Sequence, residues 1–175
     1  SGTPAEAADF YANIQAETTA QPVEERKIST TLQPQFENSD GISDMRCFWC
    51  DEKLNEKLSF ATGEDVYLYC EFKTSFDVGK VTIGVPLWNS KGEYCTGFST
   101  DRAPDTYSTA SGTVEKFLLK IPSLPLNVDS YHANITVLSG LEFLIRKAIP
   151  VLNITSGPTP RWGMVDLPYE WKKLN

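Results

Sequence analysis

The chain has 175 residues, of which 41% are hydrophobic and 22% charged, a composition typical of one globular domain with a tail or linker. Its 23 acidic and 16 basic residues give a formal net charge of -7, which opposes nucleic-acid binding because such proteins normally carry a basic face. No apolar run approaches the roughly 20 residues of a membrane span, and no secretory leader is recognisable.

The first predicted element is a short helix. Thr3 and Glu6 form a capping box around Pro4, a residue favoured at the first helical position. Apolar residues then recur on one helical stripe up to Ile14. Residues 18–40 show no period and are rich in Gln, Glu, Pro, Ser and Thr, which is linker composition. We therefore expect residues 1–40 to be a helix and linker, and residues 41–175 to be the folded domain.

The cysteines do not indicate a metal or redox site. Cys47 and Cys50 have the Cys-x-x-Cys spacing, but they lie in a segment, 45–50, that has the pattern of a strand. An odd separation on a strand sends the two thiols to opposite faces. Cys70 and Cys95 do not form a second close pair. We therefore predict reduced, mostly buried cysteines and no bound metal.

After Gly41 the dominant hydrophobic period is two, which is typical of strands. In residues 66–73, for example, the apolar residues Val66, Leu68, Cys70 and Phe72 alternate with polar or tyrosine side chains. The strands predicted in this way cover residues 66–73, 81–88, 93–100, 114–121, 131–137 and an apolar segment at 141–154. This pattern predicts an all-β fold, a two-sheet antiparallel β-sandwich of immunoglobulin-like or jelly-roll type.

Two further local features concern the edges of this sandwich. Pro86 cannot donate to a β-ladder, so it suggests a bulge or an edge in the strand 81–88. Beyond the Pro/Gly-rich residues 157–160, a detached segment at 161–171 contains a short predicted strand, 164–167. A tethered terminal strand favours exchange between two copies, so we expect a homodimer. The alternative is a strand that closes its own sandwich.

Catalytic motifs are missing from the sequence. It contains no phosphate-binding loop, no Gly-x-Ser-x-Gly elbow and no His-Glu-x-x-His. The single histidine, His132, occupies an outward strand position, where it is either solvated or a hydrogen-bonding partner of a ligand. The carboxylates fall mainly in turns and linker, where solvation explains them. We predict no catalytic residue and no cofactor.

Aromatic and amide groups at outward strand positions indicate a carbohydrate site. Sugars present apolar faces that lie on flat rings and hydroxyls that pair with amides and charged groups. The candidate glycan-binding residues, expected on one sheet, are Thr82, Trp88, Phe98, His132, Asn134, Thr136 and Arg146. The competing face, on the other sheet, carries Tyr67, Tyr69, Glu71 and Lys73. Exposed aromatics are equally compatible with dimer contacts.

Four stretches of sequence resemble a known family. They are residues 83–92 (IGVPLWNSKG), 97–100 (GFST), 121–126 (IPSLPL) and 163–171 (GMVDLPYEW). In order and spacing they resemble the C-terminal domain of Wzt-type subunits, the ATP-binding subunits of O-antigen ABC transporters. Trp88 departs from the family pattern and indicates either a ligand platform or local packing.

The resemblance implies several properties. It implies a domain that follows an ATPase domain, acts with the membrane subunit of the transporter, and binds O-antigen polysaccharide at the cytoplasmic face of the bacterial inner membrane. It further implies dimers that exchange C-terminal strands and a glycan site on the concave face of one sheet.

We therefore expect a non-catalytic carbohydrate-binding module. Two alternatives stay open at this point. One is a purely structural dimerisation module. The other is a secreted adhesion-type sandwich, for which the glycosylation sequon at Asn134 would be relevant.

Overall fold

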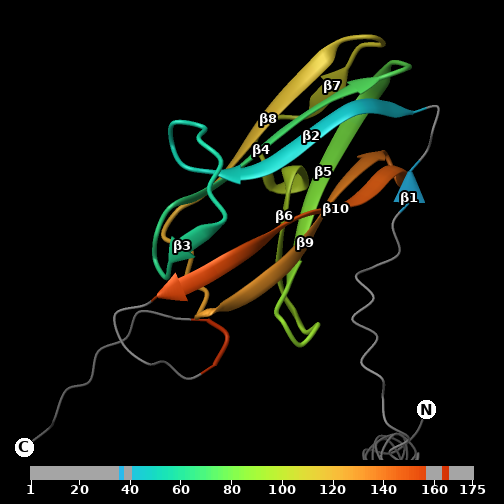
Figure 1. Cartoon of the computed structure of the whole chain (residues 1–175). Helices are drawn as coiled ribbons and strands as arrows, with labels where there is room; N and C mark the ends of the chain where they lie inside the picture. The colour runs from blue at the N-terminus through green and yellow to red at the C-terminus, as the bar shows by residue number, and fades with distance from the viewer. Residues whose placement is uncertain (1–35, 38–40, 157–162, 166–175) are drawn as a thin grey trace, which may run out of the picture.

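The structure is a computed structural model that describes residues 36–37, 41–156 and 163–165, and within these ranges its regular secondary structure is almost wholly strand (Figure 1). The only helix of these ranges is a single 3-10 turn, η1 (Thr100–Arg102). The strands are β1 (Phe36–Glu37), β2 (Ile42–Cys50), β3 (Ser59–Ala61), β4 (Val66–Thr74), β5 (Val78–Trp88), β6 (Tyr94–Ser99), β7 (Tyr107–Thr109), β8 (Val114–Ile121), β9 (Asp129–Ser139) and β10 (Glu142–Ser156).

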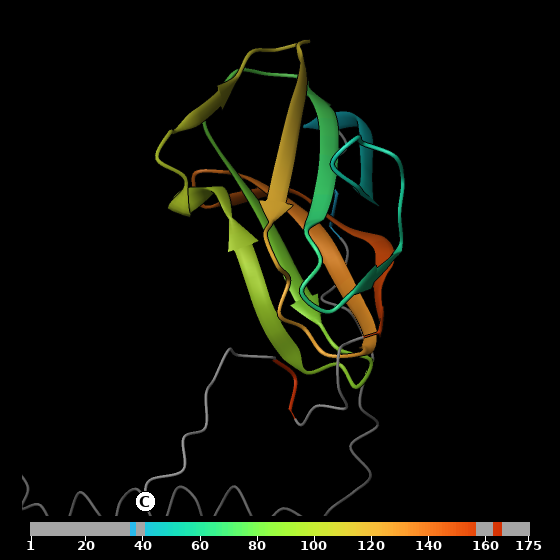
Figure 2. The same ribbon diagram turned by 90° about the vertical axis from the view of Figure 1, so that its left-hand side faces the viewer.

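The strands form two sheets of unequal width that face each other (Figures 1 and 2). The seven-stranded sheet has the order β1-β10-β9-β5-β6, with β3 also pairing with β10 and β7 also pairing with β5. The three-stranded sheet has the order β2-β4-β8. All pairings are antiparallel except that of β3 with β10. The predicted two-sheet β-sandwich is therefore confirmed.

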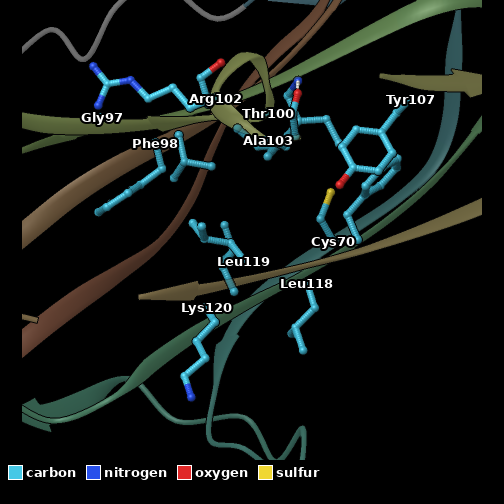
Figure 3. A pocket seen from close by; sticks show the side chains of 16 residues that line it. Cys70, Gly97, Phe98, Thr100, Arg102, Ala103, Tyr107, Leu118, Leu119 and Lys120 are labelled. Carbon is cyan, nitrogen blue, oxygen red and sulfur yellow. Dashed lines mark hydrogen bonds between the residues drawn. The ribbon is translucent and has the colours of Figure 1, made fainter. Parts of the chain in front are cut away.

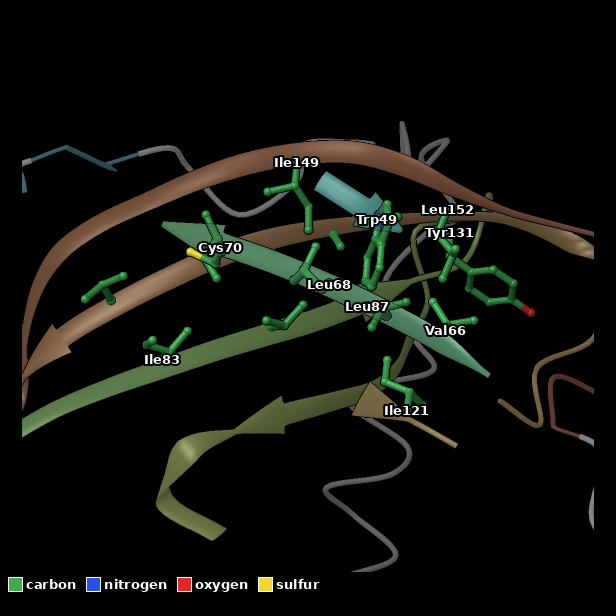
Figure 4. Close-up of a cluster of buried hydrophobic side chains, with 14 of the residues drawn as sticks. Trp49, Val66, Leu68, Cys70, Ile83, Leu87, Ile121, Tyr131, Ile149 and Leu152 are labelled. Carbon is green, nitrogen blue, oxygen red and sulfur yellow. The ribbon is translucent and has the colours of Figure 1, made fainter. Parts of the chain in front are cut away.

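Alternation within the strands builds the core between the sheets. On β4 the burial alternates strictly, with Val66, Leu68, Cys70 and Phe72 buried as the sequence predicted. They face the buried side chains of β5 and β9, among them Ile83, Leu87 and Tyr131, as Figure 4 shows. Burial of this contiguous apolar surface is the main force that holds the two sheets together.

Trp49 connects the two sheets directly. Its side chain, on β2 of the three-stranded sheet, is fully buried. Its indole Nε1 donates a hydrogen bond to the main-chain oxygen of Pro150 on β10, with an N to O distance of 2.7 Å. This hydrogen bond places β2 of the narrow sheet across from β10 of the wide sheet. The narrow sheet runs from β2 through β4 to β8, so β8 lies nearer to β5 than to β10.

The register confirms the prediction for the Cys-x-x-Cys pair. Cys47 pairs with Cys70 on β4 and Cys50 pairs with Tyr67, so the two thiols of the motif lie on opposite faces of the three-stranded sheet.

The prediction of an edge at Pro86 is wrong. β5 is an interior strand, with β9 on one side and β6 and β7 on the other. The sheet accommodates the missing N–H locally. In the ladder between β5 and β9, Gly84 pairs with Thr136 and Leu87 pairs with Ala133. In the ladder between β5 and β6, the register shifts between Leu87 and Trp88. A bulge, the other alternative predicted here, is present one residue beyond the proline, but its extra residue, Cys95, lies on β6 and not on the strand that contains Pro86.

Parts of the sequence-based prediction lie outside the described residues. These are the helix expected near the N-terminus, most of the linker, and most of the segment 161–171. Of that last segment, Val165 forms an isolated bridge with Leu126, and the main-chain nitrogen of Asn127 donates to the oxygen of Met164 at 3.1 Å. Among the described residues no helix has the length and apolar character that a membrane crossing requires.

Candidate functional site

The outer face of the seven-stranded sheet, the side turned away from the three-stranded sheet, carries an aromatic corner. Trp88 lies at the end of β5, where it pairs with His132 on β9 and with Tyr94 on β6. The Trp88 and Tyr94 ring centroids are 6.0 Å apart, with an angle of 64° between the planes. Tyr94 is 60% exposed. Trp88 and His132 are half-buried, so this corner offers ring faces to solvent beside an imidazole.

The turn of the β5–β6 hairpin sets the position of these rings. The side-chain oxygen of Asn89 accepts hydrogen bonds from the main-chain nitrogens of Lys91 and Glu93, at 3.0 and 2.8 Å. Gly92 has a φ of 78°, a left-handed conformation that favours glycine. The hairpin therefore brings Trp88 and Tyr94 opposite each other on the same face.

Tyr94 was missed by the sequence analysis, and it is the most exposed ring of the corner. A Cβ added to Gly97 would lie 2.6 Å from the Tyr94 hydroxyl oxygen and 3.6 Å from the Cα of Pro86. The tyrosine side chain therefore lies over Gly97, in space that only glycine leaves open. The four-residue turn 89–92 is the sequence signal that could have identified Tyr94, because such a turn brings the residues before and after it, such as Trp88 and Tyr94, opposite each other.

Asn134 lies next to this corner and is a buried polar side chain without a hydrogen-bond partner among the described residues. It follows His132 on β9, in the stretch opposite Pro86 between the registered pairs Gly84–Thr136 and Leu87–Ala133. Its side chain is 0% exposed, and neither Nδ2 nor Oδ1 makes a hydrogen bond with the part of the chain that the structure describes. A buried amide without a partner costs about 1–3 kcal/mol, so such a group requires an explanation.

The remaining predicted residues of this face lie further along the strands. Thr136 pairs with Gly84 on one side and Arg146 on the other. The hydroxyl of Thr82 donates to Asp101 Oδ1 at 3.1 Å, and Lys80 Nζ lies 3.4 Å from the same oxygen. The Arg146 guanidinium lies over the Phe143 ring, 4.3 Å from its centroid. This end of the face is thus richer in charge than the aromatic corner.

The structure places most of the predicted residues on one face, with two corrections. Thr82, Trp88, His132, Asn134, Thr136 and Arg146 share the outer face of the seven-stranded sheet. Phe98 does not, because it pairs with Val85 and points between the sheets, where it lines a cavity. The expected exposure is also wrong for Thr82, Asn134 and Thr136, whose side chains are buried among their neighbours on the sheet.

The competing face is the outer side of the three-stranded sheet, where Tyr67, Tyr69, Glu71 and Lys73 lie together as predicted. Two of these polar groups, Tyr69 and Glu71, are hydrogen-bonded to each other. The Tyr69 hydroxyl donates to Glu71 Oε2 at 2.5 Å, and this hydrogen bond raises the pKa of Tyr69.

The tyrosine rings of this face contact side chains from the neighbouring strands β2 and β8. The Phe48 and Tyr69 centroids are 5.1 Å apart, and Lys120 Nζ lies 5.6 Å from the centroid of Tyr67. Since these groups satisfy one another, the competing face lacks an unpaired group of the kind that Asn134 provides.

The thiols are poor nucleophiles. A hydrogen bond to Cys70, together with burial, raises the pKa of the Cys47 thiol, and burial raises the pKa of Cys50 and of Cys95. Raised pKa values keep these groups protonated near neutral pH, whereas reactive cysteines have lowered values. Within the described ranges no three His, Cys, Asp or Glu side chains gather closely enough to hold a metal ion.

Comparison with solved structures gives a likeness of fold. No protein-family model matches the sequence, and no curated protein matches it. Among solved structures, the fold is similar to one described as the crystal structure of the C-terminal domain of wzt, with a TM-score of 0.69 and 15% sequence identity over 81% of this chain and 88% of that one. The chain therefore has the fold of the Wzt C-terminal domain, a β-sandwich that the resemblance of its motifs also indicated.

Proposed function

We propose that this domain binds carbohydrate, without catalysis, on the outer face of the seven-stranded sheet. The observation that carries the proposal is the buried, unpaired amide of Asn134 next to the exposed Tyr94 and half-buried Trp88 rings. A sugar ring matches this combination, because its C–H face stacks on an aromatic ring while its hydroxyls both donate to and accept from an amide. One vicinal pair of hydroxyls supplies what both Asn134 atoms lack.

Access to Asn134 depends on Tyr94. The Tyr94 side chain lies over Gly97, which pairs with Pro86, and Pro86 lies opposite Asn134 on the other side. Because Tyr94 is mostly exposed, its rotation away from Gly97 costs little packing energy. In this proposal the Tyr94 ring moves away from Gly97 and stacks on the incoming sugar together with Trp88. The surface over Gly97 and Pro86 then becomes accessible, and the sugar reaches Asn134 from there.

The finer proposal concerns which carbohydrate is bound. The four sequence stretches that resemble Wzt-type subunits, and the similarity of the fold to the Wzt C-terminal domain, support O-antigen polysaccharide as the ligand. On the same grounds we propose a homodimeric domain that follows an ATPase domain. It acts with a membrane subunit of an ABC transporter at the cytoplasmic face of the bacterial inner membrane.

Replacement of the two rings tests the proposal. In a calorimetric titration of the purified chain with O-polysaccharide of the parent strain, Trp88→Ala and Tyr94→Ala should each weaken binding by about tenfold, since loss of one stacked ring costs roughly 1–1.5 kcal/mol. The matched control is Tyr69→Ala, which removes a ring from the opposite outer face and should leave the affinity unchanged. If Tyr69→Ala weakens binding while the other two variants bind normally, the site belongs to the three-stranded sheet.

The same titration separates carbohydrate binding from a structural role. A wild-type chain that binds no polysaccharide of the strain at millimolar concentration, while it dimerises, would instead be a dimerisation module. Measurement of molecular mass by light scattering in the same samples distinguishes this outcome from a misfolded preparation.

A further inference from the structure

A cavity opens between the two sheets at one side of the sandwich. It has a volume of about 360 Å³ and lies where β8, the last strand of the narrow sheet, faces β6 and β7 of the wide sheet and the turn η1 (Figure 3). The unequal widths explain its position. Since β2 lies above β10, the three-stranded sheet ends at β8 and leaves the far edge of the seven-stranded sheet without a strand across from it.

The walls of the cavity are mostly apolar. Phe98 from β6, Tyr107 from β7, and Phe117 and Leu119 from β8 line it, and they are only partly buried although they point toward the core. The Tyr107 and Phe117 rings meet edge to face, with centroids 5.5 Å apart and an angle of 88° between the planes. Protein interiors contain few voids larger than a water molecule, and this volume falls within the roughly 300–1,000 Å³ that is usual for ligand pockets.

The ionised side chains that line the cavity are both cationic. The only ionised side chains among the lining residues are Arg102 and Lys120, although the whole chain carries a formal net charge of -7. Figure 3 shows them at opposite ends of the cavity, with Phe98 and Leu119 between them. Lys120 Nζ is paired with Asp65 Oδ2 at 3.2 Å.

The Arg102 guanidinium makes neither a hydrogen bond nor an ion pair within the described residues. An apolar space with an unpaired guanidinium at its rim is complementary to a molecule with an apolar body and an anionic end.

We propose that this cavity binds a small amphiphilic anion, namely an acyl chain with a carboxylate that pairs with Arg102. The chain occupies the space between Phe98, Tyr107 and Leu119. This site is distinct from the carbohydrate face and does not depend on it, because Phe98 and Trp88 point to opposite sides of the seven-stranded sheet.

Octanoate and 1-octanol, which differ only in the charged end, are the probes for this site. Titration of the ¹⁵N-labelled chain with octanoate should shift the amide resonances of residues 98, 107 and 119, and 1-octanol should bind more weakly at the same place. Arg102→Gln should raise the octanoate Kd about two- to fivefold, the range expected for a solvent-accessible ion pair, and should leave the Kd of 1-octanol unchanged. Lys53→Gln, an exposed cation outside the cavity, is the matched control and should change neither.

Two variants block the cavity and check its location. Leu119→Trp places a larger side chain on the inward side of β8, where it fills the cavity, and should abolish binding of both probes. Ala103→Phe, at the residue that follows η1, serves the same purpose if the first variant does not fold. Equal affinity for octanoate and 1-octanol, an unaltered octanoate Kd in Arg102→Gln, or occupation of the cavity by a segment of a second copy, seen as intermolecular contacts in the free protein, would overturn the proposal. Trp88→Ala should not alter octanoate binding, so failure of this proposal and failure of the carbohydrate proposal are separate results.

Discussion

At the scale of single residues, Asn134 is a polar side chain at a buried position where an apolar side chain would make the folded protein more stable. The side chain is fully buried on an interior strand, yet both ends of its amide lack hydrogen-bond partners among the described residues. Alternation along β9 predicts its face correctly, but not its burial, because burial depends on neighbours from β5 and β10 that the local sequence does not specify.

Replacement of this amide by a hydrocarbon of the same shape should make the protein more stable. Asn134→Leu removes two unpaired polar atoms from a buried position, so the free energy of unfolding in urea should rise by about 1–3 kcal/mol. Affinity for the polysaccharide should fall in the same variant. A leucine variant that is less stable than the wild type would show that the amide is satisfied in the folded protein and would remove the main support for the carbohydrate site.

Tyr131 makes stability depend on pH at the alkaline end. Its ring is buried in the core, and its hydroxyl donates to the main-chain oxygen of Asn127 at 2.8 Å. Burial raises the pKa of Tyr131 from 10.0 to about 12. Above pH 10 the unfolded chain therefore loses this proton before the folded one does, and the stabilisation, complete below that pH, disappears as the pH rises to about 12.

Urea unfolding between pH 9 and about pH 12 measures this loss, which amounts to roughly 2 kcal/mol for a shift of this size. Tyr131→Phe should be less stable at neutral pH and should show a shallower decline over the same window. If the decline of the variant has the same slope as that of the wild type, another group is responsible for it.

At the scale of elements, alternation predicts the long strands and their inward faces well. β8 has the predicted bounds, and β4, β5 and β9 extend the predicted ranges by a few residues. The three-residue strands β3 and β7 were not predicted, since such short segments have no period. They form because they pair with stretches of β10 and β5 that β1 and β6 do not reach. Phe98 was assigned to the wrong face because the register of β5 and β6 shifts by one residue between Leu87 and Trp88, which pairs Phe98 with the inward Val85.

The hydrogen bond between Trp49 and Pro150 connects elements that are distant in the sequence, so no local pattern predicts it. Trp49→Phe keeps an aromatic ring but removes the indole donor and leaves a small void. The free energy of unfolding should fall by about 1–3 kcal/mol. Trp88→Phe is the matched control on a half-buried ring and should cost less than about 1 kcal/mol. Equal losses in the two variants would mean that the contact between the sheets adds nothing beyond ring size.

At the scale of the whole molecule, period-two patterning predicts a two-sheet sandwich and also which strands share a sheet. The strands of Trp88, Phe98 and Asn134 belong to the wide sheet and that of Tyr67 to the narrow one, as expected. The difference in width was not predictable, because it depends on β3, β7, β1 and the long β10 joining one sheet only. The candidate carbohydrate face follows from alternation, whereas the cavity follows from this difference in width.

The exposed edge of β8 has a consequence for behaviour at high concentration. A bare strand edge bearing apolar groups such as Val114 and Leu118 invites uncontrolled stacking of molecules. Lys116 and Lys120 alternate with them on this strand and are exposed. The repulsion between these lysines and the same lysines of an approaching molecule discourages edge-to-edge pairing and fibril growth.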